Sequence, residues 1–119
     1  MTVRVAVNGL GRIGRALLRL ATTRGDFTVV AANDLAPIEQ LLPLVARDSV
    51  HGRFPGEVSR RGSSLVLAGD EVPLSREEIP GRIPWAGASP QVVVDATGTL
   101  GSRDEAAAHL GGSVSHAIV

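Results

Sequence analysis

Apolar residues follow two different spacings along this chain, and the change of spacing separates strands from helices. A short β-branched run at residues 3–7 leads into glycines, and a second apolar run covers residues 27–33; both are typical of buried strands. Between them, apolar residues from Ile13 to Ala21 recur every three or four positions, which predicts a helix over residues 12–23. A strand, a tight turn, a helix and a strand within about 30 residues predict a βαβ unit with parallel strands.

The remainder of the chain continues this alternation. A helix is expected from Pro37 to about residue 47, with a kink or an early end at Pro43, because proline lacks the amide hydrogen. Three short antiparallel strands joined by tight turns are expected at residues 57–60, 64–67 and 71–74. After an irregular stretch, a buried strand, an alanine-rich helix opened by a capping box and a last strand are expected at residues 91–96, 102–110 and 114–119. The fold class is therefore α/β: a Rossmann-type, mainly parallel sheet with helices on both faces and a small antiparallel insert.

Composition restricts the chemistry that the chain can perform. Its 119 residues are enough for one domain, and 12 basic residues balance 12 acidic ones, so no overall basic field attracts nucleic acid or an anionic membrane. The absence of cysteine excludes a thiol nucleophile and a thiolate metal site, and the absence of lysine excludes a Schiff base. No segment is long and apolar enough to span a membrane. We expect a cytoplasmic protein that binds neither nucleic acid nor membrane.

A glycine-rich turn follows the first predicted strand and opens the first predicted helix. Its sequence is Gly9-Leu10-Gly11-Arg12-Ile13-Gly14, the dinucleotide-binding G-x-G-x-x-G pattern in its required context. Gly9 permits the sharp turn, Gly11 lets the backbone approach a pyrophosphate, and Gly14 lets the helix pack closely on the strand. The helix N-terminus presents amide hydrogens to the phosphates, and Arg12 adds a positive charge there.

Two further strand ends carry candidate cofactor contacts. Asp34 follows Gly14 by 20 residues, where a carboxylate accepts hydrogen bonds from ribose hydroxyls and repels a 2′-phosphate, favouring NAD over NADP. Thr97 and Gly98 end another predicted strand and are expected to line the same crevice. Each of these segments alone is also compatible with an ordinary strand-ending turn, but their combination favours a dinucleotide site.

No residue has the setting of a catalyst or of a metal ligand. The histidines, His51, His109 and His116, show no metal-binding spacing. His51 also lacks an evident nucleophile or orienting carboxylate, so a structural loop histidine is the simpler interpretation. We therefore predict no catalytic residue and no metal site in this chain.

Several segments together resemble one enzyme family. They are Val7 to Arg15, Asn33-Asp34, Asp48 to Phe54, Pro84-Trp85, Ala96-Thr97-Gly98 and Ala107 to Val119. In this order and spacing they resemble the N-terminal NAD-binding domain of phosphorylating glyceraldehyde-3-phosphate dehydrogenases, and erythrose-4-phosphate dehydrogenases share much of the pattern. The resemblance implies a glycolytic oxidoreductase that uses NAD on a phosphorylated aldehyde. It also implies that Arg12 and Ile13 contact the pyrophosphate, Asp34 the adenosine ribose, and Thr97 and Gly98 the path of the cofactor across the sheet.

The chain also departs from that family. The family's catalytic cysteine lies further along its chain, so residues 1–119 are expected to be a dinucleotide-binding domain truncated before the catalytic domain and inactive alone. Glu77-Glu78-Ile79-Pro80 stands in place of the family's Glu-Arg-Asp-Pro, and Leu100 in place of an aromatic residue. Two functions stay open: the cofactor half of such an enzyme, completed by a catalytic half or a homo-oligomer, or a free-standing non-catalytic module that binds NAD or a partner. A separated half is expected to expose the apolar surface that its partner would cover.

Overall fold

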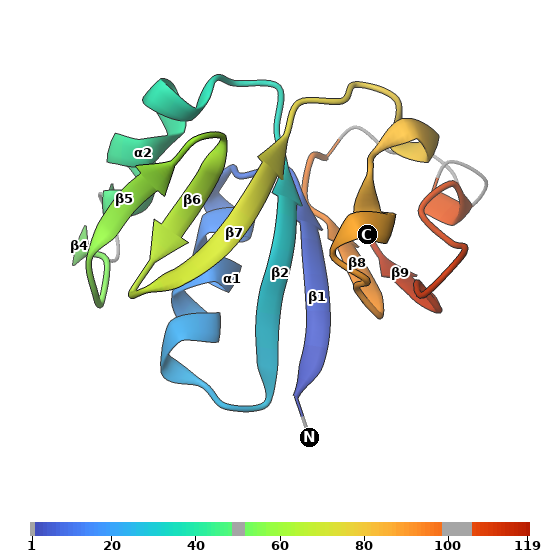
Figure 1. Cartoon of the computed structure of the whole chain (residues 1–119), viewed down its shortest axis with the longest axis horizontal. Helices are drawn as coiled ribbons and strands as arrows, with labels where there is room; N and C mark the ends of the chain where they lie inside the picture. Colours follow the sequence, from blue (N-terminus) through green and yellow to red (C-terminus); the bar gives the residue numbers. More distant parts are fainter. Residues whose placement is uncertain (1, 49–51, 99–105) are drawn as a thin grey trace.

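A seven-stranded sheet organises the computed structural model, which describes residues 2–48, 52–98 and 106–119 (Figure 1). The strand order is β5-β6-β7-β2-β1-β8-β9. The strands of this sheet are β1 (Val3–Asn8), β2 (Phe27–Asn33), β5 (Val58–Arg61), β6 (Ser64–Leu67), β7 (Asp70–Ser75), β8 (Val92–Asp95) and β9 (His116–Ile118). The helices are α1 (Arg12–Thr23), α2 (Ile38–Ala46) and the short 3₁₀ helices η1 (Pro80–Arg82) and η2 (Trp85–Gly87).

The sheet is mainly parallel, as the sequence predicts. Strand β1 pairs in parallel with β2 and β8, β2 with β7, and β8 with β9. Only the β5-β6-β7 meander is antiparallel, and it is the predicted insert. Because β7 returns parallel to β2, the carboxyl ends of four neighbouring strands, β7, β2, β1 and β8, meet at one edge of the sheet. Ligands of open α/β sheets bind outside this edge.

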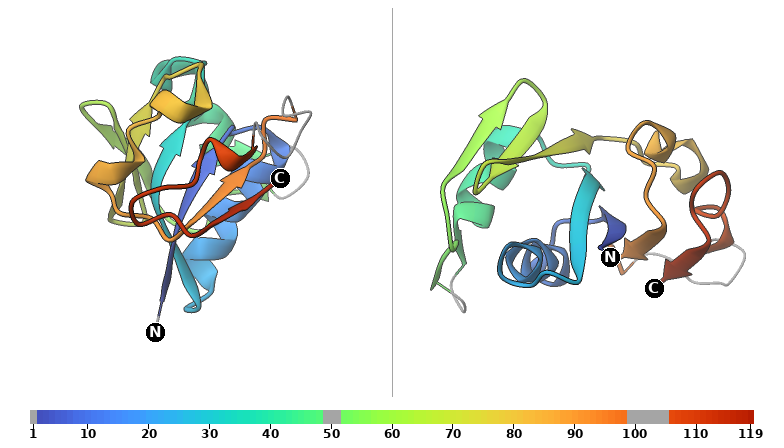
Figure 2. Two further views of the ribbon diagram at one scale, coloured as in Figure 1. Left: turned by 90° about the vertical axis from the view of Figure 1, so that its right-hand side faces the viewer. Right: turned by 60° about the horizontal axis from the view of Figure 1, so that its bottom comes forward.

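Helices α1 and α2 lie over one face of the sheet and the short helices η1 and η2 over the other (Figure 2), and each face carries an apolar cluster. On one face, Val5 and Val7 of β1 pack with Leu18 of α1 and Leu41 of α2. On the other face, the core contains Ala6, Ala31, Ile83, Trp85, Val93 and Val114. Within the described residues, the elements over this second face are η1, η2 and the short turn before β9, so both longer helices lie on the first face. The Val5-Ala6-Val7 alternation of β1 places its side chains on both faces, as expected for a central strand.

Helix α2 differs from the expectation at Pro43. The helix begins after the N-cap residue Pro37 and continues through Pro43 to Ala46, so the early end does not occur. Pro43 lies on the exposed side of α2, where solvent is available to the backbone carbonyl that the proline leaves without an amide donor. On the opposite side, Leu41 and Val45 are buried in the core and hold the helix on the sheet.

Local structure elsewhere refines the predicted elements. The sequence pattern misses a two-stranded ladder of β3 (Arg47–Asp48) and β4 (Gly52–Arg53), which is too short for a hydrophobic period. The irregular stretch before β8 contains the two 3₁₀ helices. Of the alanine-rich helix, the structure describes helical residues 106–107 and a turn at 108–109. His51, Leu100 and the capping box at residues 102–105 lie outside the described residues.

Candidate functional site

Two of the three glycines in the loop between β1 and α1 occupy positions where a larger residue would not fit. Gly9 has a φ of 97°, and a Cβ there would lie 2.9 Å from the backbone nitrogen of Thr97. A Cβ on Gly14 would lie 2.0 Å from the carbonyl oxygen of Gly9. Gly11 differs from both, since a Cβ there would have nothing within 4 Å and its φ is −75°. Two glycines therefore serve the turn itself, while Gly11 faces open space where a ligand can approach.

The first turn of α1 offers amide hydrogens for an anion. Gly11 is the N-cap residue, which has no side chain to cap the helix, and the first turn contains no acidic residue. The first hydrogen bond of the helix is donated by the Arg15 amide to the Gly11 carbonyl at 2.9 Å. Preceding amides of a helix have no partner within the helix, and the dipole makes this end positive. Arg12 and Ile13 are exposed at this end.

Asp34 links the glycine loop to the end of β2. Its Oδ2 accepts a hydrogen bond from the Leu10 amide at 2.6 Å, and its Oδ1 accepts one from the Ala36 amide at 2.9 Å. A carboxylate has about four acceptor positions, so each oxygen can accept one more hydrogen bond. Asp34 therefore has a structural role in shaping the loop, and it can still bind a pair of hydroxyl groups.

A crevice of about 540 Å³ brings these groups together at the carboxyl edge of the sheet. Its lining residues are Asn8, Gly9, Gly11, Asn33, Asp34, Leu35, Glu77, Glu78, Pro80, Ala96 and Thr97. Four predicted cofactor residues are among them, whereas Arg12, Ile13, Gly14 and Gly98 are not. Gly14 is buried behind the loop, and Gly98 is exposed with a φ of 73°.

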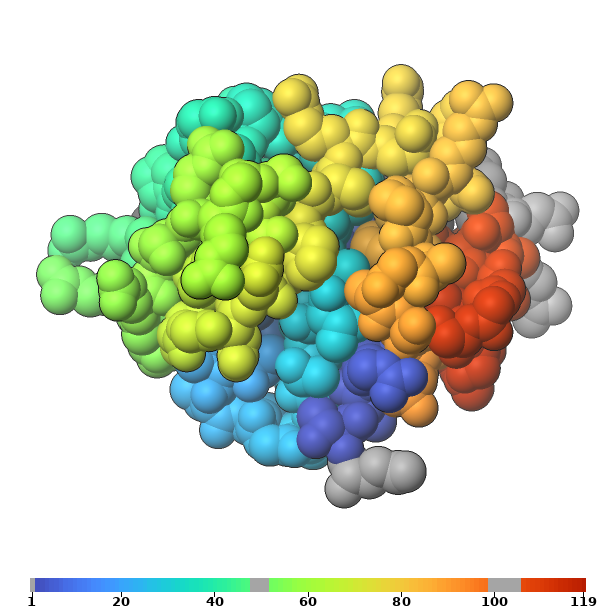
Figure 3. Space-filling model, viewed as in Figure 1, coloured from blue at the N-terminus to red at the C-terminus, as the bar shows by residue number. Residues whose placement is uncertain are grey.

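A second cavity, of about 520 Å³, lies on the face of the sheet that carries η2. Figure 3 shows this face, with β2 (cyan) visible between β7 (yellow) and the orange segment that includes η2. Its walls are mainly apolar and include Val30, Leu74 and Trp85. Its lining includes neither the glycine loop nor the start of α1, so its residues do not fit a dinucleotide, whereas those of the crevice do.

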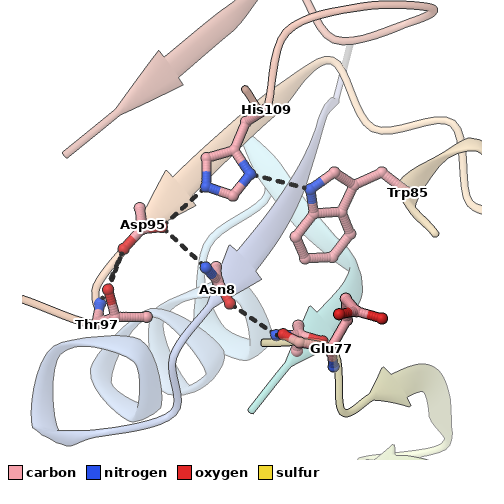
Figure 4. Close-up of polar contacts among 7 residues, drawn as sticks. Asn8, Glu77, Trp85, Asp95, Thr97 and His109 are labelled. Carbon is pink, nitrogen blue, oxygen red and sulfur yellow. Dashed lines mark hydrogen bonds and ion pairs between the residues drawn. The ribbon is translucent and has the colours of Figure 1, made fainter. Parts of the chain in front are cut away.

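A row of polar side chains runs beneath the crevice, one from each of four neighbouring strands. Strand register places Ser75 beside Asn33, Asn33 beside Asn8, and Asn8 beside Asp95. The Ser75 hydroxyl donates to Asn33 Oδ1 at 2.7 Å, and Asn33 Nδ2 donates to Asn8 Oδ1 at 2.9 Å. Asn8 Nδ2 then donates to Asp95 Oδ2 at 2.8 Å (Figure 4). The hydrogen bonds thus all run in one direction, towards a buried carboxylate.

Asp95 also receives hydrogen bonds from beyond the row. The amide and hydroxyl of Thr97 donate to Oδ1 at 3.1 and 2.6 Å, and His109 Nε2 lies 2.8 Å from Oδ2 (Figure 4). Burial by itself raises the pKa of the Asp95 carboxyl. The hydrogen bonds donated by Thr97, His109 and Asn8 outweigh burial, so the pKa of this carboxyl lies below its ordinary value of 3.8. Asp95 is therefore held ionised at neutral pH.

This lowered pKa gives Asp95 a stabilising effect that depends on pH. Because the folded pKa is below the unfolded one, the contribution is complete above pH 3.8 and is lost as the pH falls through the folded value. We expect Asp95→Asn to lower the free energy of unfolding by about 2 kcal/mol at pH 7. The substitution replaces one carboxylate oxygen by an NH₂ group, so some of the buried donors that now bond to Asp95 lose their acceptor. Urea denaturation at pH 7 and at pH 3 should show the difference from the unsubstituted chain shrinking at the lower pH. An equal difference at both values would contradict an ionised Asp95.

The polar row was not among the predicted site residues. A signal for it exists, since Asn8, Asn33 and Asp95 each end an apolar run one or two residues before a predicted cofactor residue. Glu77 belongs with them, because its amide donates to Asn33 Oδ1 at 2.8 Å and its carbonyl accepts from Asn33 Nδ2 at 2.9 Å. These two bonds fix the segment after β7 as one wall of the crevice.

Neither a metal-binding group nor a membrane-spanning helix is present in the described part of the chain. Its histidine and acidic side chains form no group of three or more that could hold a metal ion. None of its helices has the length and apolar character needed to cross a membrane.

A match to a family model and matches to individual known proteins both indicate the same family. The family model for the glyceraldehyde 3-phosphate dehydrogenase NAD-binding domain matches residues 3–103. A glyceraldehyde-3-phosphate dehydrogenase of Pseudomonas aeruginosa is 45% identical over 92% of this chain and 34% of its own length. The enzyme of Geobacillus stearothermophilus is 40% identical over 100% of this chain and 36% of its own length. The chain therefore spans about a third of the length of the curated relatives that it matches.

Proposed function

The chain belongs to the family of glyceraldehyde 3-phosphate dehydrogenase NAD-binding domains, and from this premise we propose which of its residues hold NAD. The supporting observation is the crevice, where the glycine loop, the start of α1 and Asp34 meet at the carboxyl edge of the sheet. These three features match the pyrophosphate and the ribose of one dinucleotide. As a cofactor, NAD supplies hydride acceptance; these residues supply binding and orientation.

The pyrophosphate is assigned to the start of α1. The backbone at Gly11 is open to approach, and the amides of the first turn face the same end of the helix. The exposed Arg12 side chain adds a charge that can follow the phosphates, and the exposed Ile13 is assigned to contact the pyrophosphate from the same turn. Gly9 and Gly14 contribute by allowing the loop to close on Thr97 and on α1.

The adenosine ribose is assigned to Asp34. Its two oxygens can accept from the two ribose hydroxyls while keeping their backbone hydrogen bonds. Glu77 and Glu78 also line the crevice, so a 2′-phosphate would meet several carboxylates. Thr97 and Gly98, at the end of β8, are assigned to the path of the cofactor across the sheet.

The whole protein is proposed to be an oxidoreductase of glycolysis that acts on a phosphorylated aldehyde in the cytoplasm. Relatives of about three times this length carry the name glyceraldehyde-3-phosphate dehydrogenase. Residues 1–119, which include no cysteine, would act as the dinucleotide-binding domain of such an enzyme. A catalytic segment or subunit would supply the thiol, since a further copy of residues 1–119 brings no cysteine. Ile118, the last residue of the edge strand β9, and the adjoining Val119 are exposed apolar side chains that such a partner could cover.

Calorimetric titration of the purified chain with NAD, and separately with NADP, tests the proposal. We expect saturable binding of NAD and binding of NADP weaker by about a hundredfold, which corresponds to ~2.7 kcal/mol. Absence of NAD binding by a folded chain would reject the assignment of these residues as a sufficient site.

Substitution at Gly11 tests the pyrophosphate assignment separately. Gly11→Ala leaves the fold intact, because the added methyl group meets no protein atom within 4 Å. It should weaken NAD binding by about tenfold by obstructing the approach of the phosphates, about 1.4 kcal/mol. Gly25→Ala is the matched control, since it adds the same methyl group in open space away from the crevice. Equal affinities for the two variants would place the pyrophosphate elsewhere.

A further inference from the structure

The wall of the crevice at Thr97 is supported from beneath by a chain of contacts through Asp95, His109 and Trp85. Trp85 Nε1 lies 3.3 Å from His109 Nδ1, and His109 Nε2 lies 2.8 Å from Asp95 Oδ2 (Figure 4). The side chains of His109 and Asp95 are fully buried. Asp95 in turn accepts both the amide and the hydroxyl hydrogen bonds of Thr97. A continuous path of contacts therefore joins η2 to the wall of the crevice.

The chemistry of the indole determines which group donates and which accepts in each hydrogen bond along this path. An indole N–H can only donate, so His109 Nδ1 must accept the hydrogen bond from Trp85. A neutral imidazole carries one N–H, which is then on Nε2 and points at Asp95. Trp85 thus selects the tautomer of His109 that donates to the carboxylate. Asp95 keeps its Oδ1 for Thr97 because Oδ2 is occupied by His109 and Asn8.

The consequence concerns the position of Thr97 relative to the glycine loop. The Thr97 backbone nitrogen lies so close to Gly9 that a Cβ on Gly9 would be 2.9 Å from it. A small shift of Thr97 would therefore change the width of the crevice at the turn that receives the cofactor. Two hydrogen bonds to Asp95 Oδ1 tie the Thr97 amide and side chain to the end of β8.

We propose that Asp95 and His109 are positioning residues of the NAD crevice, and that Trp85 selects the His109 tautomer that makes this possible. The proposal rests on the proposed function, because it concerns a crevice that binds NAD. None of the three residues lines the crevice, so their effect on the cofactor passes through the lining residues that Asp95 holds, Thr97 and Asn8.

A set of histidine variants tests the proposal by calorimetric titration with NAD. His109→Leu removes the donor to Asp95 and the acceptor for Trp85, and should weaken NAD binding by about tenfold. His109→Gln keeps an amide N–H for Asp95 and an amide oxygen for Trp85, so it should restore the affinity to within about threefold. His116→Leu is the matched control, because His116 is exposed on β9 and contacts Ser115.

The single tryptophan gives a spectroscopic signature that a purely structural role would not produce. Its indole ¹H–¹⁵N signal should shift as NAD is added to the unsubstituted chain, with the midpoint found by calorimetry. If His109→Leu does not fold, Trp85→Phe, which removes only the N–H and part of the ring, should by itself weaken binding about threefold.

The possible outcomes separate the two proposals. Normal NAD binding by His109→Leu, or equal losses in the Leu and Gln variants, would overturn the positioning role while leaving the NAD site intact. An indole signal that does not respond to bound NAD would overturn it as well. No NAD binding by the unsubstituted, folded chain would overturn the proposed function and the positioning role together.

Discussion

Gly14→Ala is expected to destabilise the chain by about 3 kcal/mol or more, because overpacking against backbone cannot be relieved by a side-chain rotation. The added Cβ would lie 2.0 Å from the Gly9 carbonyl oxygen and 3.3 Å from Val7 Cγ1. Relief requires α1 to move away from β1, which would separate Leu18 from the core formed with Val5 and Val7. Urea denaturation followed by far-UV circular dichroism measures the change in the free energy of unfolding.

The matched control for this variant is Gly25→Ala. Gly25 lies in an exposed turn after α1, and a Cβ there would meet nothing within 4 Å. Its stability should lie within about 0.5 kcal/mol of the unsubstituted chain. A Gly14→Ala variant as stable as the Gly25 control would show that the contact between the loop and the helix is looser than the structure describes.

Asp34→Ala is expected to cause the largest change in cofactor binding. Removing two charge-assisted hydrogen bonds to the ribose should weaken NAD binding by about a hundredfold, ~2.7 kcal/mol. Removing the carboxylate also removes its repulsion of a 2′-phosphate, so the affinity for NADP should stay constant or rise. Parallel titrations with NAD and NADP measure both effects, and the preference for NAD should fall by about the same hundredfold.

The two cofactors also distinguish the ribose contact from the structural role of Asp34. Loss of the hydrogen bond to the Leu10 amide would disturb the loop and weaken NAD and NADP equally. Equal losses would therefore contradict the assignment of the ribose to Asp34. Asp70→Ala, which removes an exposed carboxylate at the start of β7, controls for the change in net charge.

Local sequence predicts the fold well where the residues of a single helix, strand or turn show a characteristic pattern. The apolar period of residues 12–23 predicts the bounds of α1, and Gly9, Gly11 and Gly14 occur in the only context in which their spacing has meaning. Pro43 shows the limit of this reasoning. A local rule predicts an interruption, but burial of Leu41 and Val45 against the sheet maintains the helix.

The candidate site was predictable only in part, for a related reason. Gly9, Gly11, Asp34 and Thr97 line the crevice as expected, because each ends or follows a strand whose carboxyl end faces the same edge. Glu77 and Glu78 belong to a segment that departs from the family's Glu-Arg-Asp-Pro, but the sequence did not predict them as walls of the crevice. Their position depends on the return of β7 alongside β2, which no local pattern encodes.

Sequence by itself determined the α/β alternation, the mainly parallel sheet and the glycine turn that begins α1. These follow from hydrophobic period and from the backbone freedom of glycine, which act over a few residues. Only the tertiary structure decided that Asn8, Asn33 and Asp95 form a hydrogen-bonded row, and that Trp85 and His109 complete it. Strand order and register bring Asn8 and Asp95 together from positions 87 residues apart, and a buried polar group is satisfied by whichever partner the fold places beside it.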